Sequence, residues 1–235
     1  EKISAKKKIF MTATERIITG TNKVNIVSMD DPDIYGQLID QLSFRQALEL
    51  KPPILSDYRV ITFIVTKGEI ETLVRDNKRI KVNGSEFTVN EDGTTLAALV
   101  ALRKLTQEHN IRHAISFHNS ISRAQDFSKL IISENLNADF SGDLFAYHVS
   151  GNMSMGKRNE EINKFKNNSP SVVSNARCLT EGVDIPAVDA VIFADPKKGI
   201  IDIVQAAGRA MRLHPRKKLG YIIIPIIVDD NTKNN

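Results

Sequence analysis

The spacing of hydrophobic and polar residues along the chain changes near residue 94. Before that point the apolar runs are isolated: 8–13 (KIFMTA) is short, and 57–66 (DYRVITFIVT) is nearly continuous in Val, Ile and Phe. A continuous apolar run is typical of a strand buried on both faces, and we expect 57–66 to be such a strand. The run 8–13 predicts a lone strand, and two prolines at 52–53 end any helix formed by 35–51.

A hairpin is predicted ahead of this change in spacing. The segment 79–89 (RIKVNGSEFTV) carries Asn-Gly between two alternating runs, which is the strongest short-range signal for a two-residue turn. Such a turn pairs Ile80 with Phe87 and Lys81 with Glu86. We therefore expect an inserted β-hairpin near 79–89.

From residue 94 onward, segments with helical spacing alternate with short apolar runs. The expected helices are 94–110, 122–135, 157–168 and 201–213, and the expected strands are 113–119, 144–150, 171–176, 187–196 and 221–228. Alternation of this kind predicts an α/β fold, with a mainly parallel sheet and helices on both faces.

Composition narrows the class of protein. With 235 residues, 41% of them hydrophobic, the chain can bury one core with a smaller appendage. No run approaches eighteen apolar residues, and the first ten residues lack the apolar region of a signal peptide, so we expect a soluble, cytoplasmic protein. The lone Cys178 excludes an internal disulfide and a cysteine metal cluster.

The charge balance is compatible with a polyanionic partner without requiring one. The net charge is +4 and the pI is about 9.1, values that are also common among proteins that bind nothing charged. Because the chain has no Trp and few aromatic residues, any nucleic-acid contact should run mostly through the backbone phosphates.

The segment 151–158 (GNMSMGKR) comes close to the phosphate-binding P-loop pattern G-x-x-x-x-G-K-[ST]. An apolar run precedes it and a helical pattern follows it, as in a P-loop. Arg158, however, has no hydroxyl to hold Mg²⁺, and the bulky residues NMSM stand where backbone amides wrap the phosphates. These details argue against a P-loop, and the alternative is a simple turn, a P-loop lookalike, with Lys157 and Arg158 solvated.

Four segments carry candidate chemistry, and we expect them at the carboxyl ends of the parallel strands, where ligands bind. They are 116–120, 151–158, 175–185 and 205–212. The last predicts Arg209 and Arg212 on one helical face, where two guanidiniums suit a phosphoryl group. Gly208 would permit another backbone to approach closely. No metal site is predicted.

Four motifs in order resemble those of superfamily 2 helicases. The segment 11–14 (MTAT) is similar to their motif III, 116–127 (SFHNSISRAQDF) to motif IV, 176–186 (ARCLTEGVDIP) to motif V and 205–212 (QAAGRAMR) to motif VI. The resemblance covers 10–14 and 94–228 and implies the second RecA-like motor domain. The region after motif III and the ending GYIIIPIIV look most like the restriction-enzyme branch of bacterial DNA helicases.

The resemblance implies how the chain is divided. Residues 1–20 would hold the terminal strand of the first RecA-like domain and a linker, and residues 21–235 the second domain. The family's P-loop and Mg²⁺-binding motif are absent from the sequence, so we expect ATP and Mg²⁺ to act only in a complete protein. The expected partners are a first RecA-like domain of that protein and nucleic acid, with no membrane. Gln205, where DEAD-box RNA helicases have His, favours DNA.

The resemblance also implies roles for single residues. The catalytic residues would be Gln205, Arg209 and Arg212, and ATP would also meet Gly182 and Asp184. The nucleic-acid backbone would meet Asn119, Ser120, Arg123, His148, Ser150, Gly151 and Thr180. Coupling between ATP and domain movement would involve Thr12 and Thr14.

Three functions remain open from the sequence: the second motor domain of an ATP-dependent DNA helicase or translocase, the same domain of an RNA helicase, and a non-catalytic nucleic-acid-binding module on the same fold. The arginine pair argues against the last, because a module freed from hydrolysis has no use for a γ-phosphate clamp. We expect both arginine side chains to be solvent-exposed, with bracing of their own helix as the alternative. Arg123 and Arg177 could equally be surface charges.

Overall fold

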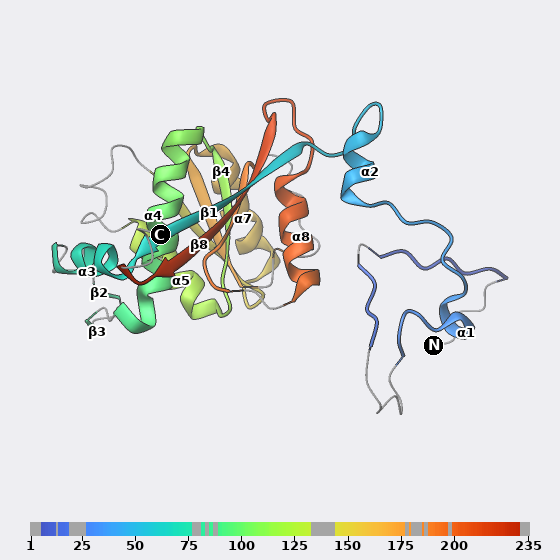
Figure 1. Ribbon diagram of the computed structural model, residues 1–235, viewed down its shortest axis with the longest axis horizontal. Helices are drawn as coiled ribbons and strands as arrows, with labels where there is room; N and C mark the ends of the chain where they lie inside the picture. Colours follow the sequence, from blue (N-terminus) through green and yellow to red (C-terminus); the bar gives the residue numbers. More distant parts are fainter. Residues whose placement is uncertain are drawn as a thin grey trace.

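A six-stranded, fully parallel sheet forms the body of the protein (Figure 1). The computed structural model describes residues 6–12, 14–18, 27–76, 81–82, 85–86, 89–132, 144–176, 179, 185, 188–196 and 199–230. Along the sheet the strand order is β1 (Asp57–Thr66), β8 (Leu219–Val228), β7 (Ala190–Phe193), β4 (His113–Phe117), β6 (Ser171–Asn175) and β5 (Phe145–Val149). The predicted α/β class and parallel sheet are confirmed.

Helices cover both faces of this sheet, because successive strand residues point to opposite sides. In β7, Ile192 packs into one buried cluster, and Val191 and Phe193 pack into the other. The first cluster is closed by α4 (Val89–His109) and α5 (Ile121–Ile132), and the second by α7 (Met155–Asn167) and α8 (Ile200–Ala210).

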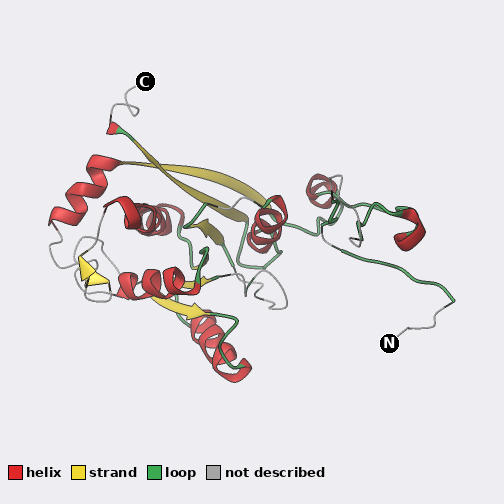
Figure 2. Cartoon of the chain, turned by 90° about the horizontal axis from the view of Figure 1, so that it is seen from below, coloured by secondary structure: helices red, strands yellow, loops and turns green. Residues whose placement is uncertain are grey.

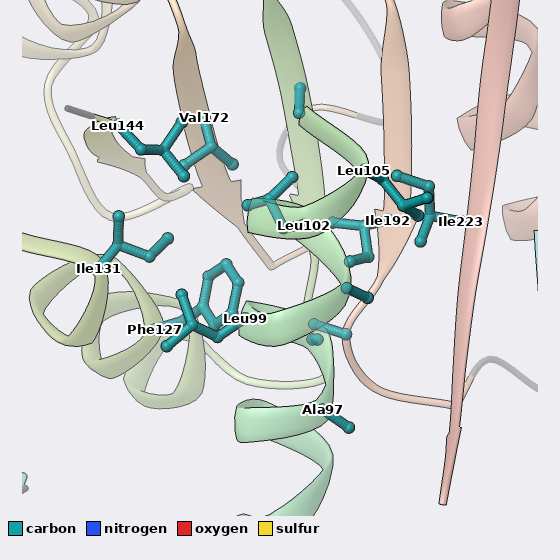
Figure 3. Close-up of a cluster of buried hydrophobic side chains, with 14 of the residues drawn as sticks. Ala97, Leu99, Leu102, Leu105, Phe127, Ile131, Leu144, Val172, Ile192 and Ile223 are labelled. Carbon is teal, nitrogen blue, oxygen red and sulfur yellow. The ribbon is translucent and has the colours of Figure 1, made fainter. Parts of the chain in front are cut away.

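The cluster under α4 and α5 explains why α4 is apolar around most of its circumference. Leu102 and Leu105 of α4 lie between α5 and the sheet, with Phe127 on one side and Ile192 and Ile223 on the other (Figure 3). All five side chains are buried. Because α4 packs against α3 (Lys67–Asp76) and α5 as well as β8, its helical stripe is wider than that of a surface helix.

The N-terminal region lies apart from the sheet. Residues 6–12, 14–18 and 27–36, with α1 (Pro32–Tyr35), extend away from the sheet in both views, whereas α2 (Phe44–Glu49) lies near α8 (Figures 1 and 2). The lone strand predicted for 8–13 is wrong for 8–12, which form no strand. A strand needs a neighbour for its backbone hydrogen bonds, and the described sheet offers this segment none.

The strand at 57–66 is confirmed as β1, but its predicted burial on both faces is wrong. It is the outermost strand and pairs only with β8 in the described sheet. Ile61 and Phe63 pack toward α4, whereas Tyr58, Val60 and Ile64 are exposed. Here the continuous apolar run forms an edge strand, and the described elements cover only one of its two faces.

The predicted hairpin is present. β2 (Lys81–Val82) and β3 (Ser85–Glu86) pair antiparallel, with Lys81 opposite Glu86 as predicted. Ile80 and Phe87 lie outside the described residues. None of the described helices is long and apolar enough to cross a membrane.

Candidate nucleic-acid and nucleotide sites

The candidate residues are divided between two edges of the sheet. Segments 116–120 and 151–158 follow the carboxyl ends of β4 and β5, as predicted. The segment 205–212 does not: α8 connects two parallel strands, so it runs back toward their amino ends. Its last residue, Ala210, lies against Gly220 at the start of β8. The expectation of one shared edge is therefore wrong for motif VI.

Motif IV forms the turn between β4 and α5. The backbone N–H of Asn119 donates to Asp195 Oδ2 at 2.8 Å, and its side chain donates to the carbonyl oxygen of Pro196 at 3.3 Å. Ser120 precedes α5, and its Oγ accepts the backbone N–H of Arg123 at 3.2 Å. Both Asn119 and Ser120 are exposed. The exposed edge thus presents an amide, a hydroxyl and a helix N-terminus.

Arg123 is neither a simple surface charge nor an unoccupied phosphate ligand. Its Nη2 lies 2.6 Å from Asp195 Oδ1, and its Nε donates to both carboxylate oxygens at 2.9 Å. The same Nη2 also donates to the hydroxyls of Thr94 and Thr95, at 2.9 and 3.2 Å. Arg123 therefore ties α5 to the carboxyl end of β7 and to α4.

Asp195 is a site residue that the sequence reasoning missed. Its side chain is 4% exposed and lies 3.9 Å from His118 Nδ1. Burial opposes its charge, but hydrogen bonds from Arg123 and from the Asn119 N–H outweigh that effect and lower the pKa of Asp195. The available signal was an aspartate that directly follows an apolar strand, at the edge where polar residues collect.

The segment after β5 is a short turn and not a phosphate-wrapping loop. Ser154 caps α7, so that Gly156 and Lys157 lie in the first helical turn. Gly151 is exposed, with open space where a Cβ would be. Ser150 is 2% exposed, and burial lowers the pKa of the half-buried His148.

Arg158 corrects the expectation of a solvated side chain. Its Nη2 donates to the carbonyl oxygens of Gly151 and Met153, both at 3.3 Å. Arg158 thus braces the turn that precedes its own helix, whereas Lys157 is exposed as expected. The reason is that residue 158 follows the Ser154 cap by four positions, which turns its side chain back over the turn.

Motif VI is arranged differently from the prediction. α8 ends at Ala210, so Arg212 lies beyond the helix, where its backbone pairs with Leu55. Arg209, inside the helix, is only 5% exposed, and Arg212 is partly exposed. The two arginines are therefore not on one helical face, and the expected exposure is wrong for Arg209. The physical reason is the turn at Met211, whose carbonyl oxygen is held by the linker before β1.

The remaining predicted residues fall into two groups. Thr180, Gly182 and Asp184 lie outside the described residues, as does Arg177. Thr12 and Thr14 contact each other, with the Thr12 hydroxyl donating to the Thr14 carbonyl at 2.9 Å. They belong to the N-terminal region that extends away from the sheet (Figure 1).

The surroundings of Gly208 show how closely another backbone approaches motif VI. The closest atom to a Cβ placed on Gly208 is Cζ of Phe44, at 3.7 Å, so α2 lies near α8 without a close backbone approach. Within the described ranges, no three His, Asp or Glu side chains form a group that could hold a metal ion.

The parallel sheet, the motif IV turn at its carboxyl edge and the arginines that end α8 define the C-terminal RecA-like domain of a superfamily 2 helicase. Residues 97–214 match the family model described as "Helicase conserved C-terminal domain", and the chain belongs to that family.

The chain is also similar to individual helicases and restriction enzymes. The chain is 24% identical over 245 residues to the protein named "Putative ATP-dependent helicase IRC3" of Saccharomyces cerevisiae, covering 86% of this chain and 34% of that protein. A structure of the ATP-dependent Type ISP restriction-modification enzyme LlaBIII bound to DNA superposes with a TM-score of 0.74 and 32% identity, over 94% of this chain and 16% of that one.

A fragment of a type I restriction enzyme HsdR subunit, titled "putative", from Vibrio vulnificus YJ016 shares the fold at a TM-score of 0.59 and 19% identity, over 86% of this chain and 37% of that one. The chain thus spans about a third or less of the length of the yeast protein and LlaBIII.

Proposed function

We propose that the chain is the second motor domain of an ATP-dependent DNA helicase or translocase. The observation that carries the proposal is the arginine pair at the end of α8, one buried and one partly exposed, in a motif VI that matches the family. DNA is favoured over RNA by Gln205 and by the likeness to LlaBIII, whose structure contains DNA.

The described residues fit a phosphoryl group better than they fit a metal. Gln205 and Arg212 are partly exposed, and guanidiniums donate in a geometry that suits phosphate oxygens. The described part of the chain offers no carboxylate cluster for Mg²⁺. In the proposed complete protein, a first RecA-like domain would hold ATP and Mg²⁺.

The arginines would then act electrostatically. ATP supplies the transferring phosphoryl group, whose oxygens gain negative charge as the bond to the leaving group breaks. Arg212 is proposed to reach that charge across the cleft between the two domains. Arg209, fixed by burial, would keep the end of α8 cationic and rigid.

Polymer contact is proposed for the other edge of the sheet. Asn119, Ser120 and Gly151 are exposed there, and the N-termini of α5 and α7 begin beside them. Helix N-termini and backbone N–H groups favour phosphate. Such contacts carry no base information, so binding should be largely independent of sequence.

The arginine assignment is tested with Arg212→Ala in the complete protein. We expect DNA-stimulated ATP hydrolysis to fall by about 10³ to 10⁵, the usual effect of removing an arginine finger. Arg212→Lys should fail as well, because one ammonium cannot replace the planar fork. The measurements are kcat and melting temperature on the same preparation, with DNA and RNA compared as activators.

Lys157→Ala is the matched control: this exposed lysine occupies the lysine position of the P-loop lookalike, and its loss should not affect ATP binding. Normal turnover of Arg212→Ala with a lowered melting temperature would show that the arginine only braces its surroundings. Stimulation by RNA alone would replace the DNA proposal with an RNA helicase.

A further inference from the structure

The backbone at the end of α8 is held from outside the helix. The Nζ of Lys217 donates to the carbonyl oxygen of Ala210 and to that of Val188, both at 2.9 Å. Ala210 is the last residue of α8, and Val188 lies two residues before β7. A single ammonium therefore joins the end of motif VI to the segment that leads out of motif V.

Two further contacts fix the same turn. Ser56, buried before β1, donates its backbone N–H and its hydroxyl to the carbonyl oxygen of Met211, at 2.8 and 3.0 Å. Gly220, in β8, lies so close that a Cβ on it would collide with the Ala210 carbonyl oxygen. The residues on either side of this turn are Arg209 and Arg212.

These contacts satisfy carbonyl oxygens that a helix leaves without partners at its C-terminus. A cation at that end also interacts favourably with the helix dipole. Both effects stabilise any helix, so neither explains why the same Nζ also bonds to Val188. That second bond ties the end of α8 to the segment just before β7, and Arg212 follows Ala210 by two residues.

We propose that Lys217 is a positioning residue for the motif VI arginines, acting through the carbonyl oxygens of Ala210 and Val188. The inference rests on the proposed function, because the positioning has a kinetic effect only if Arg212 meets a phosphoryl group. It adds a residue outside the four motifs to the catalytic machinery.

The surroundings of Lys217 disfavour its charged form and lower its pKa. Burial lowers its pKa to about 8, the neighbouring Asp189 opposes that shift, and the charge of Arg212 adds to it. A neutral amine donates more weakly to carbonyl oxygens than an ammonium does. The positioning effect should therefore weaken as the pH rises through about 8.

The test uses the complete protein and three variants: Lys217→Met, which keeps the aliphatic bulk; Lys217→Arg, which keeps a charge at all accessible pH values; and Lys218→Met, an exposed neighbour as control. We expect Lys217→Met to lower DNA-stimulated kcat on the order of 10²-fold, the cost of a misplacement near 1 Å, with little change in KM for ATP. Lys218→Met should leave both constants unchanged.

The pH profile separates positioning from stability. Wild-type kcat should decline above pH 8, and Lys217→Arg should keep its kcat there, whatever its melting temperature. If Lys217→Met is soluble and less stable but turns over normally, or if the Lys217→Arg profile equals that of the wild type, the inference is wrong. Arg212→Ala is measured in parallel: if it is active, the proposed function fails and the inference fails with it; if it is inactive while Lys217→Met is normal, only the inference fails.

Discussion

At the scale of single residues, Asp195 and Arg123 show what sequence reasoning could and could not supply. The alternation of strands and helices predicted that 116–120 lie at the carboxyl edge of the sheet, and they do. It did not predict that Arg123 would form an ion pair with Asp195, because Asp195 lies 72 positions away along the chain. Only the adjacency of β4 and β7 brings the two together.

The pair predicts an asymmetry between its two partners. Arg123→Met leaves the buried Asp195 carboxylate without its cation, so we expect a loss of unfolding free energy near the lower end of about 3–5 kcal/mol. Asp195→Asn should cost less, because the Arg123 side chain is 32% exposed and can turn to water. Urea unfolding of both variants measures the difference, and equal losses would contradict it.

The same pair predicts a pH dependence. The folded-state pKa of Asp195 is lowered, so its stabilising effect is present above the pKa of the unfolded chain and is lost as the pH falls below it. Without Arg123, only the Asn119 N–H and His118 still oppose the effect of burial, so this pKa should rise, which moves the loss to higher pH. Unfolding curves between pH 3 and 7 of wild type and Arg123→Met should separate in that direction.

At the scale of elements, the alternation of periods predicted, in the correct order, the strands and helices that the structure describes after residue 94. It misplaced the start of α4, which begins at Val89, and the end of α8, which stops at Ala210. It missed α3, although Thr66 and Glu69 form the reciprocal capping bonds of a T-x-x-E box. Helix ends depend on such local contacts more than on periodicity.

Two glycines in these elements should respond oppositely to the same substitution. Gly220→Ala places a Cβ against the Ala210 carbonyl oxygen, so the end of α8 must shift, and we expect a cost of about 1–3 kcal/mol. Gly156→Ala, inside α7 with open space around it, should instead gain about 0.5–1 kcal/mol. Melting temperatures that move in the same direction for both variants would contradict this account.

At the scale of the whole molecule, the strand order is what the sequence could not provide. Nothing in the run 57–66 indicated that β1 joins the sheet beside β8, the last strand of the chain. The resemblance assigned residues 1–20 to another domain and a linker, but nothing in the sequence indicated that α1 also lies away from the sheet (Figures 1 and 2). Both depend on contacts between segments far apart in sequence, which periodicity does not encode.

The arrangement of the described chain predicts how it behaves in isolation. It brings the motif VI arginines but no P-loop, so the purified chain should hydrolyse no ATP, with or without DNA. The measurement is phosphate release at several protein concentrations. Phosphate release that is proportional to the concentration of the purified chain, and that persists after a second purification, would contradict the proposal that hydrolysis needs a first RecA-like domain.

The antiparallel course of α8 has a thermodynamic consequence. Its eleven residues span roughly 16 Å, which separates Arg212 from the turns at the carboxyl edge. A nucleotide near Arg212 and a polymer at the carboxyl edge would contact no side chain in common. Any effect of one on the affinity of the other is therefore a coupling free energy transmitted through the domain. Linkage requires this coupling to be reciprocal: the factor by which the polymer changes the affinity for nucleotide equals the factor by which the nucleotide changes the affinity for the polymer.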